Sequence, residues 1–143
     1  MNTLTKDWKN GTDIGLLIIR LLFGILLIYG HGFGKVATIL GGDEIQFMDP
    51  IGIGATLSFY LAALAESICA LLIILGLYTR IASIILLINF AVIFIFHAFM
   101  VGDGFSILEL RYFYLFTILA LFFSGPGKYS LDHKLMKSRS SAV

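Results

Sequence analysis

Residues 57–78, LSFYLAALAESICALLIILGLY, decide how this chain folds, because they are long enough to cross a membrane and carry a carboxylate near their middle. About 20 apolar residues span the hydrocarbon layer of a bilayer as an α-helix. A carboxylate at that depth costs roughly 2.5–3.5 kcal/mol if it faces lipid. Glu66 should therefore point into a helix bundle and have a partner there. The partner that we predict is Arg20, the charge well inside the first hydrophobic stretch.

Three other stretches are also long and apolar enough to span, namely residues 14–33, 81–101 and 107–124. Hydrophobic residues make up 59% of the 143-residue chain and charged residues 13%, which is unlike a soluble domain. We predict an all-α membrane protein, a single domain over residues 1–143 that forms a bundle of four transmembrane helices. The fourth span requires Glu109 and Arg111 to lie at an interface or against protein.

Composition also excludes several classes of protein. The net charge of +1 gives no reason to expect a nucleic-acid partner. One cysteine, Cys69, lies in the middle of a span, so no intrachain disulfide, dithiol relay or thiolate metal cluster can form. We expect no bound metal. The lipid bilayer is the environment that the chain requires.

The distribution of Lys and Arg predicts the orientation of the bundle. The N-terminus carries Lys6 and Lys9, and the tight turn after the second span carries Arg80. The tail, residues 125–143, is also rich in basic residues, whereas the connection 34–56 is acidic. We therefore predict that both termini, the tail and the Arg80 turn are cytoplasmic.

The segments between the spans also carry local signals. The turn 76–80 is short enough to force an antiparallel hairpin. The connection 34–56 contains the apolar pieces VATIL and EIQFM and is predicted to be an interfacial element with one short amphipathic helix. The sequence GPGK after Ser124 is a helix stop. A last short helix is predicted to open at residues 130–133, followed by a disordered serine-rich end.

Arg20 and Glu66 are expected to meet because their helices present matching faces. A rise of about 1.5 Å per residue places the two charges at similar depth. Arg20, Gly24 and His31 fall on one face of the first helix, and Gly24 allows a neighbouring helix to approach closely. Ala62, Glu66 and Ala70 form a small-residue stripe on the second helix. We assign Glu66 and Arg20 as the candidate catalytic pair.

The outer half of the predicted bundle gathers further polar side chains above Glu66. Candidate ligand-binding residues from the ends of the first, third and fourth helices are His31, Lys35, His97, Glu109, Arg111, Tyr112 and Phe94. Each has a structural reading as well. The ion pair can simply fix helix register, the histidines can be packing residues, and the aromatics can face lipid. For the histidines, a quinone or proton-relay role and bis-histidine haem ligation also remain open, although nothing else in the sequence supports haem.

The chain also resembles a known family. Its signature segments are 20–24 (RLLFG), 31–35 (HGFGK), 65–66 (AE), 75–80 (LGLYTR), His97 and 125–132 (GPGKYSLD). In this order and spacing they are similar to DoxX-family membrane proteins, over residues 15–132. The resemblance implies a four-helix integral protein of the bacterial cytoplasmic (inner) membrane. It also implies redox or oxidative-stress physiology, a quinone, and a membrane-associated oxidoreductase partner.

Three hypotheses follow. In the first, His31 or His97 hydrogen-bonds a quinone, Glu66 with Arg20 handles the coupled proton, and a partner oxidoreductase supplies electrons. In the second, the protein is a non-enzymatic scaffold or anchor subunit. In the third, it carries a small amphipathic molecule along the polar cluster. Assembly into a homo-oligomer is left open by the sequence.

Overall fold

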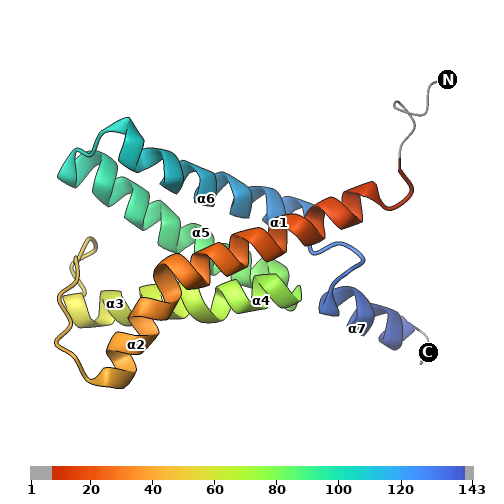
Figure 1. Cartoon of the computed structure of the whole chain (residues 1–143), viewed down its shortest axis with the longest axis horizontal. Helices are drawn as coiled ribbons and strands as arrows, with labels where there is room; N and C mark the ends of the chain where they lie inside the picture. The colour runs from red at the N-terminus through yellow and green to blue at the C-terminus, as the bar shows by residue number, and fades with distance from the viewer. Residues whose placement is uncertain (1–7, 141–143) are drawn as a thin grey trace.

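The computed structural model describes residues 8–140, and the regular structure in this part of the chain is helical throughout (Figure 1). Four helical runs are long and apolar enough to cross a membrane, namely Gly11–Gly41, Ala55–Leu75, Thr79–Val101 and Phe105–Ser124. The predicted all-α fold with four spans is therefore confirmed. Lys6 and residues 141–143 lie outside the described residues. The predicted disordered end is wrong as far as residue 140, because the last helix extends to Ser140.

The first run extends beyond its predicted end at residue 33. It consists of α1 (Gly11–Leu27), the π-helical segment η2 (Ile28–Gly32) and α2 (Phe33–Gly41). Figure 1 shows α2 bending away from the axis of α1. The run ends where Gly42 adopts a left-handed conformation, with φ of 70°, and the Asp43 N–H donates to the Thr38 carbonyl. The apolar VATIL piece thus prolongs the first helix, because no residue before Gly42 breaks it.

The second and third runs form the predicted hairpin. They are built from α3 (Ala55–Ala63), η3 (Leu64–Cys69), α4 (Ala70–Leu75), α5 (Thr79–Ile95) and η4 (Phe96–Val101). The turn between them places Gly76 and Tyr78 in the left-handed region, with φ of 64° and 47°. The fourth run is α6 (Phe105–Ser124), and the predicted short last helix is confirmed as α7 (Leu131–Ser140).

α1 packs closely on α4 through Gly24, as predicted. A Cβ atom at Gly24 would lie 2.3 Å from the Ile74 side chain and 3.0 Å from the Ala70 carbonyl oxygen, so a larger residue does not fit. Around this contact lies a core of fully buried side chains from all four spans, including Leu27, Ile73, Leu86, Ile118 and Leu121. The two small-residue faces predicted from the sequence therefore do pack together.

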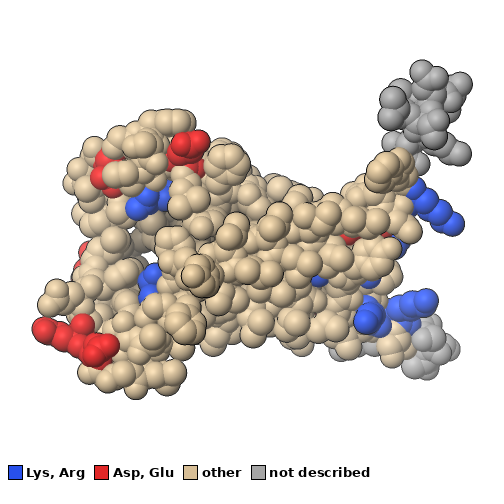
Figure 2. All heavy atoms as spheres, in the orientation of Figure 1, with Lys and Arg blue, Asp and Glu red and all other residues tan. Residues whose placement is uncertain are grey.

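The bundle has two chemically different ends. The start of α1 and all of α7 lie at one end, which we call the termini end, and the connections 42–54 and 102–104 lie at the other, the loop end (Figure 1). Lys and Arg atoms are prominent at the termini end, and Asp and Glu atoms at the loop end (Figure 2). The loop end also has a notch in which basic atoms are visible.

The tail after α6 folds back onto the bundle. The Asp132 carboxylate accepts hydrogen bonds from the backbone N–H groups of Tyr78 and Thr79, at 2.8 and 3.0 Å. Lys128 pairs with Asp13 near the start of α1, with 2.9 Å between Nζ and Oδ2. These contacts tie the tail to the hairpin turn and to the first helix.

Candidate functional site

Glu66 lies in η3 and is only 2% exposed. Its Oε2 atom is 2.5 Å from Nζ of Lys35, a residue of α2. Its Oε1 atom accepts a hydrogen bond of 3.1 Å from the Asn89 amide on α5. Asn89 is thus the interhelical hydrogen-bonding residue that its position predicts. The carboxylate has a partner, as a charge in a span requires, but the partner is a lysine from beyond the predicted end of the first helix.

Three titratable residues of the site lie on π-helical segments. His31 lies in η2, Glu66 in η3 and His97 in η4. π-Helical turns are rare and occur frequently at functional sites, because the extra residue re-aims side chains. η2 and η3 meet at Gly32, where a Cβ atom would lie 2.5 Å from the Glu66 carbonyl oxygen. Only glycine allows this approach, which brings the first and second helices together beside the Glu66 carboxylate.

These side chains line a cavity of about 180 Å³ at the loop end. The cavity is lined by His31, Lys35, Phe47, Met48, Glu66, Phe90, Ile93, His97, Leu110, Arg111 and Tyr114. Phe47 and Met48 come from the connection 42–54, and the remaining residues come from the spanning runs. The cavity therefore combines charged groups of both signs with aromatic and aliphatic walls.

His97 is held between a carboxylate and a guanidinium. Its Nδ1 atom is 2.5 Å from Oδ2 of Asp103, and its Nε2 atom is 3.0 Å from an Arg111 nitrogen. Arg111 can only donate, so Nε2 of His97 accepts and Nδ1–H donates to Asp103. Both ring nitrogens are thereby engaged, and His97 serves to position Arg111 at the cavity wall.

Arg20 does not contact Glu66, and the predicted pair is wrong. Arg20 is 1% exposed, and within residues 8–140 the acceptors of its guanidinium hydrogen bonds are backbone carbonyls. Nε donates to the Ile73 carbonyl at 3.1 Å, and Nη2 to the carbonyls of Ile74 at 3.3 Å and Tyr129 at 2.9 Å. Nη1 donates to the Pro126 carbonyl.

The reason is that a guanidinium carries several N–H donors that point in different directions. The last carbonyls of a helix have no partner within the helix, and Ile73 and Ile74 stand at the end of α4. An arginine can satisfy several carbonyls at once, and a positive charge is favourable at a helix C-terminus. Ile73 lies about two helical turns from Glu66, so Arg20 belongs to a different layer of the bundle. Arg20 therefore does not share a site with Glu66.

The other predicted site residues divide into two groups. His31, Lys35, His97 and Arg111 line the cavity with Glu66, whereas Glu109, Tyr112 and Phe94 do not. Glu109 is exposed, and the rings of Phe94 and Tyr112 pack against each other with centroids 4.8 Å apart. The fourth helix therefore presents Arg111 to the cavity, whereas Glu109 and Tyr112 lie outside it.

Sequence reasoning missed several cavity residues. Tyr114 makes an edge contact with the His31 ring at 5.7 Å and lies 4.9 Å from the Phe90 ring. Its position three residues after Arg111 places both on one helical face, which is a signal that could have identified it. Asp103, which pairs with His97 but does not line the cavity, had no such signal, because it belongs to a connection whose path depends on the packed helices. Among residues 8–140, no group of three or more His, Cys, Asp and Glu side chains is arranged to hold a metal.

Fold and site together define a helical membrane protein with four spans and a partly polar cavity at one end of the bundle. The family model DoxX matches residues 15–98, more than half of the 143 residues, and the chain belongs to the DoxX family. This confirms the family predicted from the sequence, while the similarity noted at 125–132 lies beyond the matched residues. No curated protein and no solved structure matches the chain.

Proposed function

We propose that this protein binds a quinone, or a similar small apolar molecule with acceptor oxygens, in the cavity at the loop end. In this proposal it works with a partner oxidoreductase in redox or oxidative-stress physiology. The observation that carries the proposal is Glu66, a nearly buried carboxylate that lines a cavity together with Lys35 and Arg111. A bilayer makes such groups costly unless they are paired or take part in function, and the cavity leaves space for a ligand beside them.

The residues of the cavity fit a quinone head. A quinone ring is flat and apolar and has two carbonyl oxygens that accept hydrogen bonds. Phe90 and Tyr114 supply an aromatic wall, and the Lys35 ammonium supplies a donor. Arg111 lines the cavity as well, and its buried Nε atom has no hydrogen-bond partner among the described residues. An apolar pocket with a few convergent polar groups is the usual form of a small-molecule site.

Each polar group then has a role. When bound, a quinone supplies an acceptor for electrons and protons. Lys35 and Arg111 hold its oxygens, and Glu66 is the group placed to exchange a proton with it. Asn89 keeps the Glu66 carboxylate in position through its amide. The chain has one cysteine, Cys69, which is buried in the core, so the electrons come from the partner oxidoreductase rather than from a dithiol of this chain.

The proposal places the protein in a bacterial cytoplasmic membrane, with the termini end in the cytoplasm. The support is the excess of basic residues at that end, such as Lys128 and Lys134, against the acidic Asp43 and Glu44 at the loop end (Figure 2). The cavity then opens towards the outer leaflet. Impermeant thiol labelling of Glu44→Cys and Lys134→Cys in intact cells tests this orientation. Label should reach position 44 only, and labelling of both positions, or of position 134 alone, would contradict it.

Binding of a ubiquinone analogue to the purified protein tests the ligand assignment. Glu66→Gln keeps the shape of the side chain but removes its charge, and Glu109→Gln is the same change at an exposed residue outside the cavity. We expect Glu66→Gln and Lys35→Met to weaken binding by about tenfold or more, which is roughly the loss of one charge-assisted hydrogen bond. Glu109→Gln should bind as the parent does.

The same preparations separate the alternatives. Mass spectrometry of molecules that co-purify with the parent should find a quinone. A parent that binds no quinone and retains no small molecule would instead indicate a scaffold or anchor. Retention of another amphipathic molecule would indicate a carrier. Equal quinone binding by the parent and by Glu66→Gln would show that the ligand does not use Glu66.

A further inference from the structure

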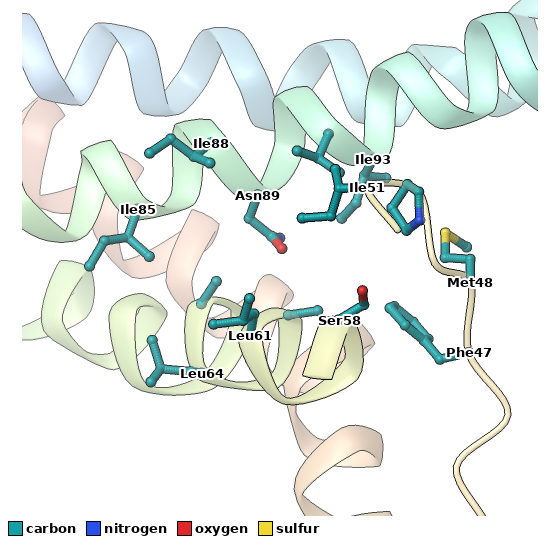
Figure 3. Close-up of a pocket in the computed structure, with 14 residues that line it drawn as sticks. Phe47, Met48, Ile51, Ser58, Leu61, Leu64, Ile85, Ile88, Asn89 and Ile93 are labelled. Carbon is teal, nitrogen blue, oxygen red and sulfur yellow. The ribbon is translucent and has the colours of Figure 1, made fainter. Parts of the chain in front are cut away.

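A second cavity, nearly all apolar, lies between the second and third spans. Its volume is about 200 Å³, and Figure 3 shows it enclosed by side chains from α3, η3 and α5 and from the connection 42–54. Leu61 and Leu64 form one wall, and Ile85 and Ile88 form the other. We call this cavity the groove. Because it lies between two spanning helices, its surroundings in the cell are hydrocarbon chains.

The groove lies next to the polar cavity, and the two share part of their lining. Phe47, Met48 and Ile93 line both. Asn89 lines the groove and donates its amide hydrogen bond to Glu66, which lines the polar cavity. In Figure 3 the Asn89 side chain points from α5 across the gap towards the opposite helix. One hydrogen-bonded pair of side chains therefore stands between a polar compartment and an apolar one.

The polar atoms of the groove give little reason for water to fill it. Ser58 donates its hydroxyl to the Asp49 carboxylate at 3.1 Å, and the Asn89 amide is engaged by Glu66. The remaining lining is aliphatic or aromatic, with the proline ring of Pro50 at one edge. Such a surface favours a flexible hydrocarbon chain over water, because it offers apolar contacts and few hydrogen-bonding partners.

We infer that the groove holds the hydrocarbon tail of the ligand whose head lies in the polar cavity. The ligand is then a membrane-dissolved amphiphile with a long chain, such as an isoprenoid quinone, and it enters sideways from the bilayer between α3 and α5. This inference rests on the proposed function and specifies its ligand class. The lining that the two cavities share favours the tail of the same molecule over a separate lipid.

Two probes and two variants test it. The probes are the ubiquinone head without a side chain and the same head with a decyl side chain. Leu61→Trp places a bulky ring in the groove, and Leu22→Trp makes the same change on α1, away from it. The two leucines are matched in exposure, at 50% and 58%. Thermal unfolding of each variant establishes that it is folded before binding is measured.

The parent should bind the decyl probe at least about tenfold more tightly than the head alone. Leu61→Trp should lose this preference and keep its affinity for the head, and Leu22→Trp should match the parent. Equal affinity of the parent for both probes, or a preference that survives in Leu61→Trp, would overturn the groove assignment and leave the head site standing. Binding of neither probe by the parent would overturn the proposed function and the groove assignment with it.

Discussion

The two buried charges of this bundle, Arg20 near the termini end and Glu66 near the loop end, are satisfied in opposite ways. Arg20 donates to four backbone carbonyls. Glu66 meets the side chains of Lys35 and Asn89 and faces a cavity. Backbone carbonyls cannot change protonation state, so the hydrogen bonds of Arg20 form a fixed structural network. Side-chain partners beside open space can rearrange and exchange partners, which suits binding. Burial of a charge alone therefore does not identify a functional site; the nature of its partners does.

The largest effect on stability is expected from removing the hydrogen-bond network of Arg20. Arg20→Met leaves the carbonyls of Ile74, Pro126 and Tyr129 without the Arg20 donor, and it removes the hydrogen bonds from α1 to the tail. Unsatisfied buried groups cost about 1–3 kcal/mol each, so the free energy of unfolding should fall by roughly 3 kcal/mol or more. Unfolding in mixed detergent micelles measures this change. Arg80→Met, at an exposed arginine near the same end, is the control and should stay close to the parent.

A smaller effect on stability is expected from removing the charge of Glu66 at the polar cavity. Glu66→Gln removes the carboxylate partner of Lys35, but the lysine side chain is 15% exposed and long enough to reach water. The loss should be about 1–2 kcal/mol. Lys35→Met combined with Glu66→Gln should cost less than the sum of the single changes, because the two residues interact. Additive losses would contradict the pairing, and a loss as large as that of Arg20→Met would remove the contrast between the two ends.

A third prediction concerns the cap that holds α7 against the hairpin turn. Asp132→Asn weakens the hydrogen bonds to the N–H groups of Tyr78 and Thr79, and loss of such a cap costs about 1 kcal/mol. The tail should become more susceptible to protease while quinone binding at the loop end stays unchanged. Asp43→Asn, at an exposed residue of the loop end, is the control. Weakened binding in Asp132→Asn would show that the two ends are coupled.

The smallest effect is a pH dependence confined to the loop end. Hydrogen bonds from the Gly54 N–H, the Ser58 hydroxyl and the Ile53 N–H hold the pKa of Asp49 below its usual value. A lowered pKa means that this stabilisation is complete above the unfolded value of about 3.9 and is lost as pH falls through the folded pKa. Limited proteolysis of the connection 42–54 should therefore speed up only in strong acid. Asp49→Asn should remove that pH dependence, and an unchanged acid profile would contradict the assignment.

Local signals in the sequence were enough to predict the architecture. Hydropathy over 20-residue stretches predicted four spans, the turn at 76–80 predicted the hairpin, and Gly24 with Ala70 predicted the contact of the first and second runs. Each of these signals depends on the length, composition or spacing within one segment. These properties do not depend on how the rest of the chain folds. The extension of the first run to Gly41 was missed because its apolar residues suit an interfacial segment as well as a helix.

The sequence by itself therefore determined which charges would be buried in the membrane and that each would need a partner. Only the tertiary structure decided which partner each charge has. Arg20 and Glu66 have opposite signs and similar nominal depth, yet backbone carbonyls at the end of α4 satisfy one and a lysine on a bent extension satisfies the other. Depth counted along straight helices ignores the bend at η2 and the returning tail. The bend and the returning tail are products of packing. They separate the Arg20 network at one end of the bundle from the polar cavity at the other.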